Sequence, residues 1–371
     1  MTFAKKIKSI ALLSVLLYAQ TNAYTQFKQS YNPDIDFYTT TDFESVKKID
    51  AHVHIRTLDT SFVHQAKKDN FRVLSIVVDE DPGIQVQQKD AIYQKQLFPD
   101  EVSFATTFSV KNFNDPKWKK EVISDLKKSF SEGAIAVKIY KNIGMDLKDK
   151  AGNFVMIDNP KFDPVLDFLT KHHIPVIGHL GEPWNCWLPM NQMTMNHDKR
   201  YYSKHPEFYM YLHPECPSYE DQINARDSML EKHPDLRFIG AHLGSLEWNT
   251  DELAKRLDRF PNMAVDMAAR IPNLQYLAMK DWQKVHDFFM KYQDRLLYGT
   301  DRIADGTQKA AEAEELAHSA WLRDWQFFCT NDKMNSSNFE GDFKGLKLPK
   351  EVINKIYRLN AEKWFPPLRK K

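Results

Sequence analysis

Two histidines stand one residue apart in the segment 49–55, which reads Ile-Asp-Ala-His-Val-His-Ile. Apolar and polar residues alternate there, as is typical of a β-strand. Because residues two apart on a strand point to the same side, His52 and His54 are expected to project together at the strand end. Neutral imidazoles held this close are good ligands for a divalent metal such as zinc. Taken alone, the pair is equally compatible with two half-exposed strand histidines.

Polar residues that can bind a metal also lie in or after later apolar segments. Lys138 lies inside the apolar segment 134–140, and lysine is rarely buried without a partner. His179, His242 and Asp301 lie at the ends of three further apolar segments. Each histidine alone could be a satisfied buried residue, and Asp301 could cap the following turn. Together with the two histidines of the first strand, these residues predict one shared metal site.

A repeating α/β fold would bring these residues together. Apolar segments of strand length alternate with segments of helical periodicity, which predicts parallel β-α-β units. Eight such pairs favour a closed (β/α)₈ TIM barrel over a doubly wound sheet, and no glycine-rich phosphate loop follows the first strand. The expected strands are 49–55, 71–78, 102–110, 134–140, 175–180, 236–242, 263–267 and 295–300, and the expected helices are 60–70, 84–97, 116–131, 163–173, 219–233, 250–260 and 274–292.

Two long insertions, 141–162 and 181–218, follow strands rather than helices. They are therefore expected on the C-terminal face of the barrel, where barrel enzymes build their active sites. The first contains a turn signal at 150–153, and the second is rich in Pro, Trp, Tyr and His, which favours an ordered lid. Residues 308–371 are expected to add helices outside the barrel. No linker divides 24–371, which predicts a single domain.

Residues 1–23 have the pattern of a secretory signal peptide: an early lysine cluster, a short apolar run, and a small-residue cleavage site at Ala23. This predicts a periplasmic or secreted protein. The run is shorter than the ~20 residues that span a bilayer, so no membrane association is expected after its removal. The formal net charge of +1 gives no electrostatic footprint for nucleic acid. A homo-oligomer remains open.

The three cysteines do not form a disulfide framework or a zinc-finger spacing. Cys186 and Cys216 lie in the same insertion and could pair, whereas Cys329 lies far along the chain. A metal would therefore need ligands derived from His, Asp or Lys.

The sequence resembles the amidohydrolase superfamily, and specifically its amidohydrolase-related branch of barrel enzymes. The motifs that carry the resemblance occur in the family's order: Asp-Ala-His-Val-His at 50–54, Val-Lys at 137–138, Gly-His at 178–179, Gly-Ala-His-Leu-Gly at 240–244 and Gly-Thr-Asp at 299–301. They extend over roughly residues 46–305 and are specific for the superfamily, but they do not identify the substrate.

The resemblance implies that a metal is bound by His52, His54, His179 and Asp301. The histidine-rich ligation favours zinc, although such sites also accept manganese, iron and cobalt. The resemblance also implies that His242 either binds a second metal or acts as a catalytic hydrogen-bond partner. Family members with a lysine on the fourth strand often carry it as a carbamate that bridges two metals, which would apply to Lys138. Many members of the branch lack this lysine and use one metal, so one ion and two ions both remain open.

A divalent metal lowers the pKa of bound water toward ~7. Asp301 could take a proton from that water and deliver it to a leaving group, and His242 could stabilise an oxyanion. Arg270 follows the seventh strand and could bind a substrate carboxylate or form a surface ion pair. Three residues of the second insertion could contact a sugar or aromatic ring, or could pack the lid onto itself: Glu182, Trp184 and Tyr211.

These features predict a metal-dependent hydrolase that acts on a small molecule with a lactone, ester or amide bond. The alternative is a non-oxidative decarboxylase of an aromatic or related carboxylic acid, since the same branch uses a similar site for that reaction. A binding protein on an inactive barrel is disfavoured by the complete set of candidate ligands.

Overall fold

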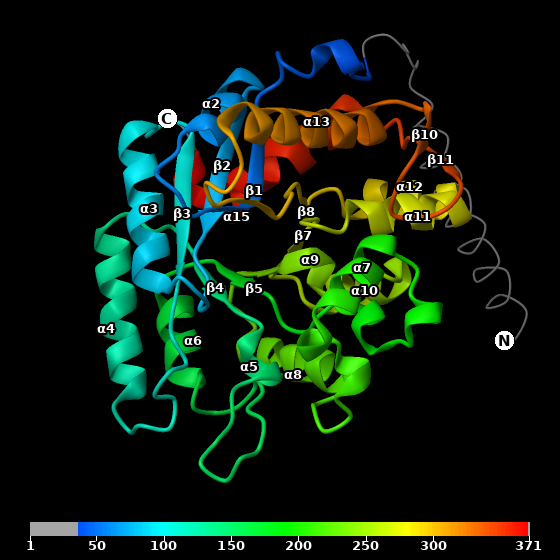
Figure 1. Ribbon diagram of the computed structural model, residues 1–371. Coiled ribbons are helices and arrows are strands. Elements are labelled where there is room, and N and C mark those ends of the chain that lie inside the picture. Colours follow the sequence, from blue (N-terminus) through cyan, green and yellow to red (C-terminus); the bar gives the residue numbers. More distant parts are fainter. Residues whose placement is uncertain (1–35, 370–371) are drawn as a thin grey trace, which may run out of the picture. The chain divides into compact units, whose positions relative to one another are not determined.

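Nine parallel strands form one sheet in the computed structural model, which describes residues 36–369 (Figure 1). The strand order is β8-β7-β6-β5-β4-β3-β2-β1-β9, so that consecutive strands from β1 to β8 are neighbours. The expected signal segment 1–23 lies outside the described residues. The strands are β1 Lys48–Ile55, β2 Phe71–Ile76, β3 Val102–Thr107, β4 Val137–Ile139, β5 Val176–Gly178, β6 Phe238–Gly240, β7 Met263–Asp266, β8 Leu296–Leu297 and β9 Arg302–Ala304.

The two ends of this strand series meet. The Ala51 N–H in β1 donates to the carbonyl of Tyr298, the residue after β8, with an N···O distance of 2.9 Å. The short strand β9, which the sequence did not predict, follows β8 and pairs in parallel with β1. The sheet therefore curls back on itself, in an α/β arrangement consistent with a TIM-like barrel.

Helices connect the strands and surround the sheet (Figure 1). Defined caps begin several of them: the Ser218 side chain accepts a hydrogen bond from the Asp221 N–H, and Asn249 caps the helix that follows it. The helices between the strands are α2 Ser61–Lys68, α3 Ile84–Leu97, α4 Trp118–Ser131, α6 Asp163–Lys171, α8 Tyr219–Lys232, α10 Thr250–Arg259, α11 Ile271–Lys280 and α12 Trp282–Tyr292, and the later ones are α13 Ala310–Cys329, α14 Lys350–Asn354 and α15 Asn360–Trp364.

The single helix predicted over 274–292 is wrong, because the chain breaks it into α11 and α12. Asp281 adopts an extended conformation at the break, and its carboxylate accepts a hydrogen bond from the Lys284 N–H at 3.1 Å. An aspartate that caps a new helix ends the previous one.

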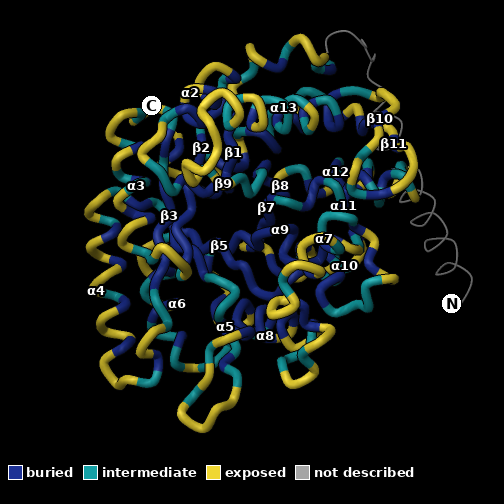
Figure 2. The backbone as a smooth tube through the Cα atoms, viewed as in Figure 1, coloured by how far each residue is buried: buried dark blue, intermediate teal, exposed yellow. Residues whose placement is uncertain are grey.

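Strands β1 to β8 are buried on both faces apart from one half-buried residue each in β2 and β3, β9 is partly exposed, and the outer faces of the helices are exposed (Figure 2). Ile49 and Ala51 pack in an inner cluster, whereas Val53 and Ile55, which follow a bulge between Asp50 and Val53, pack in the larger cluster with the helices. The end of the chain joins the inner cluster through Phe365 and its neighbours. The strand ends that carry the candidate ligands are thus fixed by a core on each side.

The segment 181–218 is built from short helices: η2 Trp184–Trp187, η3 Met190–Gln192, α7 Asn196–Lys204, η4 Pro206–Phe208 and η5 Met210–Leu212. It has its own buried cluster, which includes Tyr202 and Cys186. Cys186 and Cys216 are both free thiols. The segment 141–162 contains α5 Asn142–Met145 and an antiparallel bridge between Lys148 and Phe154 that encloses the predicted turn.

In the described part of the chain, none of the helices has both the length and the apolar character needed to cross a membrane.

Candidate metal centre and its cavity

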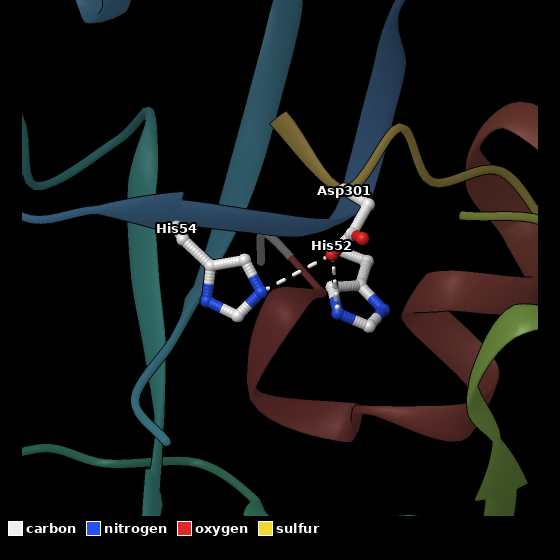
Figure 3. Close-up of side chains that lie close together, drawn as sticks. All are labelled: His52, His54 and Asp301. Atoms are coloured by element: carbon white, nitrogen blue, oxygen red, sulfur yellow. Dashed lines mark hydrogen bonds and ion pairs between the residues drawn. The ribbon is translucent and has the colours of Figure 1, made fainter. Parts of the chain in front are cut away.

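His52, His54 and Asp301 come together where β1 ends and the chain passes from β8 to β9 (Figure 3). Their potential ligand atoms all lie within 4.8 Å of one another. Asp301 Oδ1 is 3.3 Å from His52 Nε2 and 3.2 Å from His54 Nε2. Tetrahedral ligands with ~2.1 Å bonds to one zinc ion would be separated by roughly 3.4 Å. The three side chains therefore have the spacing of ligands to a single ion.

Hydrogen bonds fix which ring nitrogen of two histidines faces the centre. His54 Nδ1 lies 2.7 Å from the Ile76 carbonyl, and His242 Nδ1 lies 2.9 Å from the Ala268 carbonyl. Because a carbonyl only accepts, Nδ1 must carry the proton in each ring. Each neutral ring is then left with an unprotonated Nε2, the form that can bind a metal.

Asp266, at the end of β7, orients His52. Its Oδ2 lies 2.8 Å from His52 Nδ1, and its Oδ1 accepts the backbone N–H groups of His242 at 2.9 Å and Ala268 at 3.1 Å. A carboxylate behind a ligating histidine is the usual support of such a ring in metal sites. Asp266 was not predicted as a site residue. Like Lys138, it is a charged residue inside an apolar strand, and such residues are rarely buried without a partner, so the same pattern could have identified it.

Burial favours the neutral form of the histidines around the centre. It lowers the pKa of His54, lowers the pKa of His179 to about 4, and lowers the pKa of His242 well below its ordinary value. Burial would raise the pKa of Asp301, but the neighbouring histidines, His242 foremost, hold it well below the usual range. Neutral imidazoles beside an ionised carboxylate are the protonation states that a divalent metal requires.

His179 and His242 line the same cavity without joining the group of three. Their ring centroids are 4.3 Å apart, and the His242 ring lies 5.0 Å from that of His52. His179 Nε2 is buried, and its 3.7 Å separation from Glu182 Oε2 is too long for a hydrogen bond, so no described residue satisfies it. An imidazole nitrogen without a partner on a residue that lines the cavity fits a further ligand or substrate contact.

Lys138 is buried in β4, and its Nζ lies 3.4 Å from His52 Nε2. Burial lowers its pKa to about 8, against the opposing attraction of Asp266 and Asp301. The lowered pKa makes the neutral amine, which is the form able to react with carbon dioxide, more accessible than in an exposed lysine.

The backbone is left-handed at two site residues, with φ of 58° at His242 and 63° at Asp301. Such conformations cost of order 1–3 kcal/mol each and persist only where the surroundings impose them. The Asp301 N–H donates to the His52 carbonyl at 2.8 Å. Asp50 accepts hydrogen bonds from both the N–H and the hydroxyl of Thr300, at 3.1 and 2.6 Å. Asp50 thus positions the loop that presents Asp301.

A cavity of about 450 Å³ opens over the centre. Among the described residues that line it, four are cationic and four are carboxylates: Arg56, Lys138, Lys141 and Arg270 against Glu80, Glu182, Asp198 and Asp301. Arg56 pairs with Glu80 at 2.6 Å, and Lys141 pairs with Glu182. With Lys138 protonated these charges balance, and a bound dication then makes the cavity net positive, which favours an anionic substrate.

Arg270 is a buried cation of this cavity with only a distant acidic partner. It is 8% exposed, its Nη1 is 3.9 Å from Asp198 Oδ1, and its Nε has no hydrogen-bond partner among the described residues. A buried guanidinium with free donors is suited to a carboxylate.

The predicted site residues divide into two groups. All six predicted ligands line the cavity, together with Arg270 and Glu182. Trp184 and Tyr211 do not line it: Trp184 packs on Tyr219 and Trp248, and Tyr211 is 50% exposed beside Tyr209. The sequence did not single out several residues that the lid and neighbouring loops bring to the wall: Glu80, Tyr140, Lys141, His197, Asp198, Tyr201 and Tyr202.

Residues 110–366 match the family model described as Amidohydrolase. Among solved structures, 2,6-dihydroxybenzoate decarboxylase from Rhizobium is similar over 86% of this chain and 99% of its own, with 14% identity and a TM-score of 0.50. Dihydroorotase from Saccharomyces cerevisiae with 5-fluoroorotic acid is similar over 86% and 84%, with 12% identity and a TM-score of 0.46. At such identities the likeness concerns the fold alone. No curated protein sequence matches the chain.

Proposed function

The chain belongs to the amidohydrolase family, and we propose that it is a metal-dependent hydrolase acting on a carboxylate-bearing small molecule with a lactone, ester or amide bond. The observation that carries this proposal is the group formed by His52, His54 and Asp301 at the base of the cavity. The unpartnered donor of Arg270 in the same cavity supports the choice of an anionic substrate.

The donor set fits a divalent ion, with zinc favoured by the histidines. His52, His54 and Asp301 would hold it, and His179 has the free nitrogen of a further ligand. When bound, the metal supplies Lewis acidity toward a carbonyl and lowers the pKa of water. Lys138 has the burial and lowered pKa that carbamate formation needs, which supports a two-ion site as the fuller form of the proposal.

Proton transfer and substrate binding would be carried out by side chains of the protein. Asp301 is ionised and partly exposed to the cavity, so it can accept a proton from water and return it to the leaving group. The neutral His242 ring, fixed through Nδ1, is left with an unprotonated Nε2, which can accept a hydrogen bond from water or bind a second metal but cannot donate to a carbonyl oxygen. Arg270 would bind the substrate carboxylate and so orient the scissile bond.

Decarboxylation is the second candidate, and the cavity itself favours it as well. An anionic substrate that places its carboxylate toward a metal, instead of toward Arg270, would release carbon dioxide, and a proton taken from water and relayed through Asp301 or His242 would replace it on the carbon. The Rhizobium structure with a similar fold bears the name of such an enzyme.

Two further parts of the proposal concern the whole chain: a closed (β/α)₈ barrel whose segment 181–218 covers the site, and export to the periplasm or medium directed by residues 1–23.

Product analysis distinguishes the two reactions. A panel of lactones, N-acyl amino acids and aromatic acids, each with a carboxylate, is incubated with metal-loaded protein in water enriched in oxygen-18. Hydrolysis predicts one heavy oxygen in the product and no carbon dioxide. Decarboxylation predicts carbon dioxide and no incorporated heavy oxygen. Absence of turnover across the panel by protein with a full metal complement would contradict the proposed substrate class.

A further inference from the structure

A hairpin of the C-terminal region packs against α11. Its strands are β10 Lys333–Asn335 and β11 Asp342–Lys344, which pair antiparallel, and the hairpin lies beside α11 (Figure 1). Phe339, in the turn between the strands, is 5% exposed and packs edge-on against Tyr276 of α11, with ring centroids 5.5 Å apart. Because a buried aromatic ring contributes much packing energy, the turn is firmly attached to α11.

The same turn also contacts the start of α7, in the segment 181–218, through three of the described hydrogen bonds. The Asn196 N–H donates to the Asn338 carbonyl at 2.7 Å, and the Asn196 side-chain amide donates to the Ser337 carbonyl at 3.1 Å. His197 Nδ1 lies 3.1 Å from Asn338 Oδ1. The first N–H groups of a helix have no acceptor within the helix. The turn therefore supplies an acceptor that α7 lacks.

Both helices that the turn contacts contribute to the wall of the cavity over the metal centre. Arg270 immediately precedes α11, and its Nη1 is 3.9 Å from Asp198 Oδ1 on α7. Four residues of α7 line this cavity: His197, Asp198, Tyr201 and Tyr202. The turn thus joins the two helices that carry the pair formed by Asp198 and Arg270.

We propose that this turn holds α7 beside α11 and that Asn338 is a positioning residue for the cavity wall next to Arg270. The inference rests on the proposed function, in which Arg270 binds the substrate carboxylate. Asn338 acts through His197 and is not among the described residues that line the cavity. Release of α7 would remove Asp198 and its neighbours from the wall and expose Arg270 to water, whose high dielectric constant weakens the attraction for a carboxylate.

Hydrogen exchange of the α7 amides, measured by mass spectrometry on the full metal-loaded protein, tests the attachment without any substrate. Asn338→Ala removes one of the three hydrogen bonds and should speed exchange about two- to tenfold. Asn338→Asp keeps an oxygen acceptor for His197, so its exchange should stay within twofold of the wild type. Asn335→Ala, the same change at an exposed position of β10, is the matched control and should leave exchange unchanged.

A double variant, Asn196→Pro with Asn338→Ala, removes all three hydrogen bonds. Proline is favoured at the first position of a helix, so α7 itself can still form. This variant should exchange at least tenfold faster than the wild type. In calorimetric titration it should bind benzoate, used as the carboxylate probe, at least threefold more weakly, while its zinc affinity stays within twofold of the wild type.

Thermal melts establish that each variant is folded. Unchanged exchange in the double variant, or exchange in Asn338→Asp as fast as in Asn338→Ala, would overturn the attachment. Faster exchange with wild-type affinity for benzoate, or an equal loss of zinc affinity, would overturn the positioning role. If the wild type does not bind benzoate at millimolar concentration, the proposed anionic substrate fails and the positioning role fails with it, whereas the attachment of α7 is still decided by the exchange rates.

Discussion

Asp266→Asn tests whether the proposed centre depends on the support behind its ligands. The carboxylate accepts three hydrogen bonds, two from backbone N–H groups to Oδ1 and one from His52 Nδ1 to Oδ2. An asparagine oxygen can still accept the two backbone N–H groups. Its NH₂ group would then face His52 Nδ1 and favour the tautomer with the proton on Nε2, which cannot bind a metal.

The magnitude follows from the one interaction that is lost. A charge-assisted hydrogen bond is worth roughly 1.5–3 kcal/mol, which corresponds to about 10–100-fold in an equilibrium constant. This agrees with the 10–100-fold loss of affinity typical when the carboxylate behind a metal-bound histidine is changed. Asp266→Asn should therefore weaken metal binding about 10–100-fold, with activity at limiting metal falling in parallel.

The assay is a competition titration with a chelating dye, read alongside activity at a series of metal concentrations. Asp69→Asn is the matched control. Asp69 is also fully buried and accepts from a histidine, His318 Nδ1 at 2.9 Å, but neither residue lines the cavity. It should lower stability and leave metal affinity unchanged. Wild-type affinity in folded Asp266→Asn, or an equal loss in Asp69→Asn, would refute the reasoning.

Three further changes probe other parts of the site and the fold. Arg270→Met should raise KM for carboxylate-bearing substrates about 10–100-fold, because one charge-assisted contact is lost, while the corresponding amides show no such change. Lys138→Ala should lose most activity and regain part of it with added short carboxylic acids plus metal; failure of every acid to restore activity would contradict the carbamate. Burial raises the pKa of Asp324 from 3.8 to about 7, so the folded state holds this proton more tightly and stability falls as pH rises through that window. Asp324→Asn, whose amide oxygen can still accept from Tyr298, should therefore stabilise the protein more at pH 8 than at pH 4 in denaturant melts; an equal effect at both pH values would exclude this account.

The order of strands and the place of the ligands can be predicted because both depend on local patterns. Apolar segments alternate with helical ones, and polar residues at the ends of parallel strands must meet at one edge. These patterns alone predict that His52, His54 and Asp301 lie together, as the structure shows them. The break at Asp281 could not be predicted, because the helical spacing of apolar residues continues on both sides of this capping residue.

The walls of the cavity cannot be predicted in the same way. The segment 181–218 has no helical or strand periodicity, so its sequence does not say that Tyr202 is turned inward while Tyr211 is exposed. The sequence leaves Trp184 free either to contact a substrate ring or to pack within its own segment, and in the structure it packs against Tyr219 and Trp248. Such positions are set by packing between segments far apart in the chain.

The central claim is that His52, His54 and Asp301 hold a catalytic metal. The most direct measurement is an anomalous-difference map of zinc-loaded crystals, collected on both sides of the zinc absorption edge. We expect a peak bonded to His52 Nε2, His54 Nε2 and an Asp301 oxygen, and its loss in the double variant His52→Ala with His54→Ala. A peak elsewhere in the chain, no peak at saturating zinc, or a retained peak in the double variant would contradict it.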